Sequence, residues 1–267
     1  MKKLISVLAV IALVAGFSGC GEDSANNDQD KYRQGEGGIV LGGVLRINEV
    51  ENLRNMFPHN LTGAPSHRVA NQIYEGLVKF DQATLKIKPS LAERWEMNED
   101  ATVFTFYLRE GVTFQDDECF SGGKGRDVTA KDFEWCFTRL CTSYPDNQLS
   151  AFVIDRIKGA REYFESTVAG SPLAEGVTGI TVIDDYTLQI EMVYPFPGFM
   201  NILAHQSCWV FPKEAWEAYG VDMRIKCVGT GPFQIKVMKE GESIVLERNP
   251  NYWGYDPLAL FAPHRGY

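Results

Sequence analysis

The sequence has no excess of basic residues, and after its first twenty residues it has no apolar run long enough to cross a bilayer. Its 26 Lys and Arg stand against 35 Asp and Glu, which gives a formal net charge of −9. Binding to a phosphate backbone requires a basic patch, so nucleic acid is not an expected partner. A membrane-spanning helix needs about 20 predominantly apolar residues. We therefore expect a soluble, acidic body.

Sequence patterns that carry chemistry are also missing. The chain has no G-x-S-x-G nucleophile elbow, no C-x-x-C pair and no H-x-x-x-H among its four histidines. The glycine-rich stretch at residues 122–125 lacks the spacing of a phosphate-binding loop and indicates a surface turn. We expect no enzyme activity, no metal site and no cofactor. A secreted hydrolase would need a nucleophile and a base that these patterns do not supply.

The N-terminus has the pattern of an export signal. Lys2 and Lys3 precede an apolar run at residues 4–15, which predicts a signal peptide over residues 1–19. The segment 17–20, Phe-Ser-Gly-Cys, resembles a bacterial lipobox with Phe in place of the usual Leu, which implies lipidation of Cys20. An ordinary signal with an incidental cysteine is the alternative. Residues 20–38 are polar and are expected to form a flexible tether. The acidic body is repelled by anionic headgroups, so the lipid alone would anchor it in the cell envelope.

Five cysteines follow Cys20, and an odd number leaves at least one thiol unpaired. In an exported protein we expect the disulfides Cys119–Cys141 and Cys208–Cys227. Cys136 falls on the core-facing side of a predicted helix, where a buried thiol is expected. Zinc is a competing possibility, but the cysteine spacings match no familiar zinc finger.

Hydrophobic periodicity predicts a mixture of short strands and helices. Residues 103–108 alternate in polarity as a half-buried strand does. Thr129 and Asp132 form a capping-box pattern ahead of a helical stripe at 133, 136, 137 and 140. Other strands are expected at 44–48, 180–183, 186–192, 233–237 and 244–248, and other helices at 67–77, 197–205 and 213–219. The fold class is therefore α+β, with antiparallel hairpins.

Six blocks of sequence, in the same order, resemble the family 5 solute-binding proteins, which are the peptide-binding receptors of ABC importers. The blocks are YEGLV (74–78), PSLAERW (89–95), TFYLREGVTF (105–114), DVTAKD (127–132), VGTGPF (228–233) and NPNYWG (249–254). The resemblance implies a two-lobed, periplasmic-binding-protein-like fold of type II. Family members are about twice as long as this sequence. We therefore expect residues 39–254 to be the N-terminal part of lobe I, an incomplete lobe with a mixed sheet, and residues 255–267 to be a divergent tail.

The resemblance also implies a function. The segment Thr62, Gly63 and Ala64 corresponds to one that runs along the ligand and pairs with its backbone; an ordinary loop bounded by prolines is the alternative. The expected partners are a peptide and ABC permease subunits, and binding is expected to be impaired by truncation. The class of solute remains open between peptide, nickel and sugar. The alternative function is a lipid-anchored structural or interaction fragment in the periplasm or at the cell surface, without a small ligand.

Overall fold

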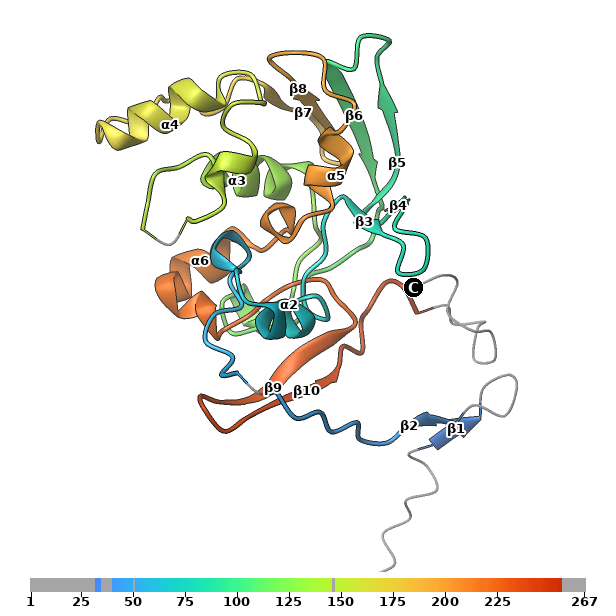
Figure 1. Ribbon diagram of the computed structural model, residues 1–267. Helices are drawn as coiled ribbons and strands as arrows, with labels where there is room; N and C mark the ends of the chain where they lie inside the picture. The colour runs from blue at the N-terminus through green and yellow to red at the C-terminus, as the bar shows by residue number, and fades with distance from the viewer. Residues whose placement is uncertain (1–31, 35–39, 50, 146, 256–267) are drawn as a thin grey trace, which may run out of the picture. The chain divides into compact units, whose positions relative to one another are not determined.

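A computed structural model describes residues 32–34, 40–49, 51–145 and 147–255 (Figure 1). The chain divides into two compact units, one that ends at Ile47 and one that begins at Asn48. The predicted signal peptide, Cys20 and all of the predicted tail except Tyr255 lie outside the described residues.

The described part of the first unit contains one small antiparallel ribbon. Strand β1 (Tyr32–Gln34) pairs with β2 (Val40–Gly42), with Tyr32 opposite Gly42. Strand β1 falls inside the predicted tether, so the expectation of a wholly irregular tether is wrong at these three residues. The strand expected at 44–48 is also wrong, because the structure has no strand there. A strand needs a partner for its backbone groups, and no described residue pairs with 44–48.

The second unit is built around an antiparallel sheet with the strand order β5-β6-β8-β7. These strands are β5 (Ala92–Met97), β6 (Val103–Leu108), β7 (Ile180–Asp184) and β8 (Thr187–Glu191). On β6, Phe104 and Phe106 are fully buried and lie opposite Ile190 and Leu188 of β8. The predicted strand at 103–108 and the predicted hairpin at 180–192 are therefore confirmed. Their apolar face forms one side of the core.

Helix α3 (Ala130–Leu140) covers this sheet and contacts β7 and β8 (Figure 1). Thr129 and Asp132 form the predicted capping box, in which the Thr129 N–H donates to Asp132 Oδ2 at 2.8 Å. Phe133 and Phe137 are buried toward the core. The sequence-based prediction of this helix, its start and its buried face is confirmed.

One arginine links the start of α3 to a second helix, α6 (Lys213–Tyr219). The Arg126 guanidinium donates to both carboxylate oxygens of Asp132, at 2.9 and 2.7 Å. It also donates to both carboxylate oxygens of Glu214, at 2.7 and 2.8 Å. Asp132 is only 4% exposed, and the ion pair with Arg126 offsets the cost of burying it.

Replacement of this arginine is expected to destabilise the protein. Arg126→Met leaves the buried Asp132 carboxylate without its counter-ion, and we expect the free energy of unfolding to fall by about 2–3 kcal/mol. Urea denaturation measures the change. The matched control is Lys124→Met, which breaks the solvent-exposed pair between Lys124 and Asp116 and is expected to cost less than about 0.5 kcal/mol. Equal losses in the two variants would contradict the structural role of Arg126.

The remaining elements surround this core. They are β3 (Val78–Phe80), β4 (Ile87–Pro89), α2 (Ala64–Ala70), α4 (Ala160–Val168), α5 (Phe199–Leu203), β9 (Phe233–Lys239) and β10 (Ser243–Arg248). The described residues also form the short 3₁₀ helices η3 (Pro58–Asn60), η4 (Ser121–Gly123), η5 (Ser150–Phe152), η6 (Gln206–Cys208) and η7 (Gly220–Arg224). The hairpin β9–β10 and helix α6 lie where they were predicted, whereas α2 begins and ends earlier than the predicted helix at 67–77.

The two predicted disulfides are not present, because all five described cysteines are free. The backbone N–H of Cys119 donates to Asp117 Oδ1 at 2.9 Å, and Cys227 Sγ points toward Met223 O at 3.9 Å. Both thiols are free, and the Cys227 thiol is directed to a backbone carbonyl and not to Cys208. Cys136 is buried, as expected.

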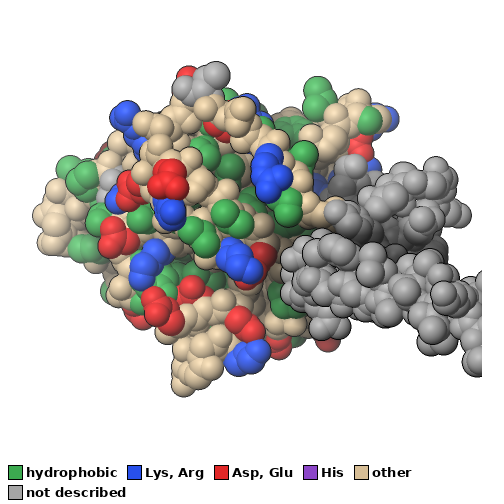
Figure 2. Space-filling view, turned by 90° about the horizontal axis from the view of Figure 1, so that it is seen from below, with side chains coloured by type: hydrophobic (Ala, Val, Ile, Leu, Met, Phe, Trp, Pro, Cys, Tyr) green, Lys and Arg blue, Asp and Glu red, His purple; other side chains and the backbone are tan. Residues whose placement is uncertain are grey.

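The surface of the second unit carries charges of both signs. Acidic and basic side chains are interspersed on the face shown in Figure 2. Exposed ion pairs include Arg224–Glu240 at 2.7 Å, between η7 and the turn that joins β9 to β10, and Lys236–Glu247 at 2.8 Å, between β9 and β10. Such exposed pairs contribute little to stability but keep the surface hydrated. In the part of the chain that the structure describes, no helix combines the length and the apolar character needed to span a bilayer.

Candidate functional site

The segment that the sequence associates with a ligand is an extended stretch that leads into α2. Leu61 and Gly63 have extended backbone angles, and Ala64 is the first residue of the helix. Thr62 and Gly63 are exposed. Among the described residues, no hydrogen-bond partner is found for the N–H groups of Thr62 and Gly63 or for the carbonyl of Thr62. These groups are therefore free to pair with another extended chain.

A cavity of about 370 Å³ lies beside this segment. It is lined by Leu61, Thr62, Gly63, Ala64, His67, Arg68 and Gln206. Gln206 of η6 donates from its Nε2 to the carbonyl of Leu61 at 3.1 Å. This hydrogen bond joins residues far apart in the sequence and holds the extended segment against η6.

Two histidines of this region are neutral at pH 7. His67 packs against the Trp209 ring at 5.4 Å, and His205 stacks on Phe152 at 4.5 Å. Burial lowers the pKa of both imidazoles, and the neighbouring His67 lowers the pKa of His205 further. A neutral imidazole has one donor and one acceptor, and His67, which lines the cavity, can use them toward amide groups, whereas His205 Nδ1 already contacts Ser207.

A buried carboxylate joins three of the sequence blocks that resemble the family. Glu75 is 8% exposed and accepts hydrogen bonds from Thr230 Oγ1 at 2.9 Å, Tyr252 OH at 3.1 Å and Trp253 Nε1 at 2.8 Å. Burial raises the pKa of Glu75, whereas these hydrogen bonds and the charge of Lys79 act in the opposite direction. The blocks at 74–78, 228–233 and 249–254 thus meet at one acceptor.

The glycines of the block at 228–233 allow a close backbone contact. A Cβ atom at Gly229 would lie 2.1 Å from the carbonyl oxygen of Ile73, and one at Gly231 would lie 2.5 Å from that of Gln72. The Gly231 N–H donates to Ile73 O at 2.8 Å. The block at 228–233 therefore has a structural role, since a larger side chain at either glycine would clash with the backbone of 72–73.

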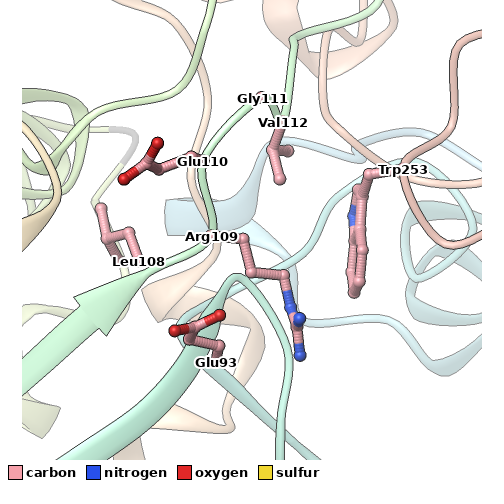
Figure 3. A pocket seen from close by; sticks show the side chains of 7 residues that line it. All are labelled: Glu93, Leu108, Arg109, Glu110, Gly111, Val112 and Trp253. Atoms are coloured by element: carbon pink, nitrogen blue, oxygen red, sulfur yellow. The ribbon is translucent and has the colours of Figure 1, made fainter.

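A second cavity, of about 550 Å³, lies next to Trp253 (Figure 3). The Arg109 guanidinium lies 4.9 Å from the centre of the Trp253 ring, and its Nε donates to Ser90 O at 2.8 Å. Glu93 and Glu110 also line the cavity, and Figure 3 shows both side chains together with Arg109 and Trp253. This cavity brings together the blocks at 89–95, 105–114 and 249–254.

Among the described residues, no group of three or more His, Cys, Asp and Glu is placed to hold a metal ion. Both histidines near the first cavity contact aromatic rings, and His205 Nδ1 lies 3.0 Å from Ser207 Oγ. Burial raises the pKa of the neighbouring Cys208 to about 12, so this thiol is not activated as a nucleophile.

The structure places the predicted ligand segment on an exposed, extended stretch but puts Ala64 in a helix. The backbone of Ala64 belongs to the first turn of α2, so of the three predicted residues only Thr62 and Gly63 lie in the stretch before the helix. Sequence reasoning missed Gln206 and His67 as lining residues and Glu75 as the common acceptor. A carboxylate inside the apolar stretch at 73–78 was the available signal for Glu75.

Comparison with solved structures shows that the fold corresponds to part of a periplasmic binding protein of type II. The profile of the bacterial extracellular solute-binding proteins, family 5 (Middle), matches residues 86–260. The chain belongs to this family, whose members are solute-binding proteins and not enzymes.

Individual relatives have names that refer to peptides. The periplasmic oligopeptide-binding protein OppA of Salmonella typhimurium is 30% identical over 254 residues, which cover 94% of this chain and 42% of the relative. The dipeptide-binding protein of Escherichia coli is 31% identical over 191 residues, which cover 69% of this chain and 33% of the relative. The crystal structure of Haemophilus influenzae OppA with the peptide RPPGFSPFR is 29% identical, with a TM-score of 0.63, over 75% of this chain and 37% of that one. This chain therefore spans less than half the length of these relatives.

Proposed function

We propose that the chain is the substrate-binding component of an ABC importer and that it binds peptides for delivery to the permease. The exposed, unpaired backbone groups of Thr62 and Gly63 carry this proposal. A receptor for peptides of varied sequence must recognise the main chain that all peptides share, and strand addition achieves this through backbone hydrogen bonds. The names of the relatives, which refer to oligopeptides and dipeptides, support the same class of ligand.

The geometry of the cavity supports a role for its walls as well. The hydrogen bond from Gln206 fixes the Leu61 carbonyl, so the extended segment is held in place before any ligand arrives. Such preorganisation lowers the entropic cost of binding. His67 and Arg68 line the remaining wall and supply polar groups next to the ligand backbone.

The proposal includes export and a lipid anchor. Relatives named as periplasmic support export, and the pattern of residues 1–20 supports a lipid on Cys20. Permease subunits are the proposed protein partners. Mass spectrometry of the mature protein tests the anchor, because a diacylated Cys20 would become the first residue.

Removal of one backbone donor is expected to weaken peptide binding. Gly63→Pro deletes the N–H of residue 63, and the extended φ of −92° at this position needs a change of about 30° to reach the φ of proline. We expect the dissociation constant to rise about tenfold, which corresponds to one lost hydrogen bond. Titration of the ¹⁵N-labelled chain with di- to pentapeptides, followed by NMR, measures the change. If these contacts supply about half of the binding free energy of a micromolar complex, about −4 kcal/mol, the dissociation constant is about 1 mM. The titration must therefore extend to about 10 mM peptide.

The matched control removes a side chain and keeps the backbone. Thr62→Ala should bind peptides within about twofold of the original chain, because strand pairing uses main-chain groups. Equal weakening by Thr62→Ala and Gly63→Pro would argue against backbone pairing. Absence of any shift with the folded chain at 10 mM peptide would favour a structural fragment without a small ligand.

A further inference from the structure

Two buried cysteines end neighbouring elements of the core. Cys141 directly follows α3 and is fully buried, and Cys208 is the last residue of η6 and is 2% exposed. Helix α3 and η6 pack against each other. Both thiols belong to the same hydrophobic core.

A nearby contact fixes how the chain around η6 runs along α3. Cys136 Sγ donates to the Phe211 carbonyl at 3.3 Å and lies 3.5 Å from the Phe211 N–H. Cys141 is five residues further along, or about 7.5 Å at the rise of a helix. Cys208 is three residues before Phe211, a reach of about 10 Å in extended chain. The segments 136–141 and 208–211 can therefore lie side by side, from the contact between Cys136 and Phe211 to the thiols of Cys141 and Cys208.

The electrostatics of the thiols agree with this placement. Burial raises the pKa of Cys141, and the neighbouring Cys208 raises it further. Burial also raises the pKa values of Cys119 and Cys227, and their further contributions come from Asp117 and Glu214 and from Tyr74. The packing of α3 against η6 therefore selects Cys141 and Cys208 as the candidate pair, and the electrostatic effect of Cys208 on Cys141 agrees with it.

Both thiols are free in the structure. We propose that Cys141 and Cys208 form a disulfide when the chain folds in an oxidising compartment. The oxidant is a small disulfide such as oxidised glutathione. The thiolate of one cysteine attacks it, releases one small thiol and forms a mixed disulfide. The thiolate of the second cysteine then displaces the other small thiol. One S–S bond forms and one breaks, and the two protein thiols give two electrons and two protons to the oxidant.

The bond must form before the core closes. Only thiolates attack disulfides, and raised pKa values leave few thiolates on the buried cysteines at neutral pH. An oxidant added after folding should therefore react slowly, whereas one present during folding should react readily. The bond would close a loop of 67 residues, from position 141 to 208, which restricts the unfolded chain.

The bond would also bear on the candidate ligand site. It ties η6 to α3, and η6 carries Gln206, which holds the Leu61 carbonyl. A tighter η6 would keep the extended segment in place. This second consequence rests on the proposed peptide-binding function, whereas the bond itself does not.

Peptide mapping tests the bond directly, because trypsin places all six cysteines in different peptides. The chain is refolded with oxidised and reduced glutathione, alkylated and digested without a reductant. We expect peptides 140–156 and 162–213 to be joined, with a mass two hydrogens below their sum, and to separate on reduction. The remaining cysteines fall in peptides 4–31, 110–124, 132–139 and 227–236. Alkylated Cys141 and Cys208, or links that follow the pairs Cys119–Cys141 and Cys208–Cys227, would overturn the proposal.

Thermal unfolding supplies an independent measurement. The oxidised chain should melt on the order of 10 °C above the reduced chain. Cys208→Ala should abolish this difference, and Cys119→Ala should preserve it. The peptide map of the unsubstituted chain decides the proposal even if Cys208→Ala does not fold. Oxidation without any peptide binding would leave the disulfide intact as a finding and would refute the proposed function alone.

Discussion

Glu75→Ala is expected to lower the free energy of unfolding by about 3–5 kcal/mol. The substitution removes the acceptor shared by Thr230, Tyr252 and Trp253 and leaves a cavity in the core. The Thr230 hydroxyl is fully buried, so water does not readily replace the lost acceptor. Urea denaturation followed by tryptophan fluorescence measures the loss, and Trp253 itself should report a changed environment.

Two further variants separate the hydrogen bonds from the charge. Glu75→Gln keeps one carbonyl acceptor and the volume, so we expect a smaller loss, of about 1–3 kcal/mol. Glu99→Ala removes an exposed carboxylate and should change stability by less than about 0.5 kcal/mol. If Glu75→Ala were as stable as Glu99→Ala, the junction of the three sequence blocks would not depend on this carboxylate.

The parts of the fold that the sequence predicted are those with strong local signals. Helix α3 has a capping box at Thr129 and Asp132 and a single apolar stripe, and both are used as expected. Strand β6 alternates between buried and half-buried residues along its length. In these elements the local pattern and the tertiary packing favour the same structure, so the pattern is sufficient.

Helix α2 shows where local patterns fail. The apolar spacing predicted a helix at 67–77, but α2 ends at Ala70. The carbonyls of Gln72 and Ile73 accept from the N–H groups of Phe233 and Gly231, at 3.0 and 2.8 Å. These donors, which lie far away in the sequence, occupy carbonyl groups that a longer helix would need for its own hydrogen bonds. The apolar spacing within residues 67–77 does not indicate such distant donors.

The cysteines and the candidate site show the same limit. Spacing along the sequence leaves several disulfide connectivities open, and the structure leaves the thiols of both predicted pairs free. In the site, Thr62 and Gly63 came from a family resemblance. Gln206, which holds the adjacent Leu61, lies 145 residues away in sequence, and only the tertiary fold brings the two together.

Acid sensitivity is the other large effect that the structure predicts, and His59 is its source. His59 of η3 is fully buried between the rings of Phe57 and Phe211, at 5.3 and 5.1 Å. Burial, assisted by the charge of Arg139, lowers the pKa of its imidazole from 6.5 to about 3. Nδ1 lies 3.2 Å from Tyr144 OH, and Nε2 has no hydrogen-bond partner among the described residues. A second cation next to Arg139 is therefore strongly disfavoured.

Stability should fall as the pH decreases from about 6.5 toward 3. In this window the unfolded chain takes up a proton at residue 59 and the folded chain does not, so protons favour unfolding. Each pH unit costs up to about 1.4 kcal/mol, which amounts to about 3 kcal/mol at pH 4. Urea denaturation at pH 7, 6, 5 and 4 gives the slope.

His59→Phe fills the site without a titrating group and should flatten the curve between pH 6.5 and 4, whatever its stability at pH 7. His67→Gln, which removes a half-buried imidazole, should retain most of the slope. A His59→Phe variant with the original slope would show that other groups take up the protons.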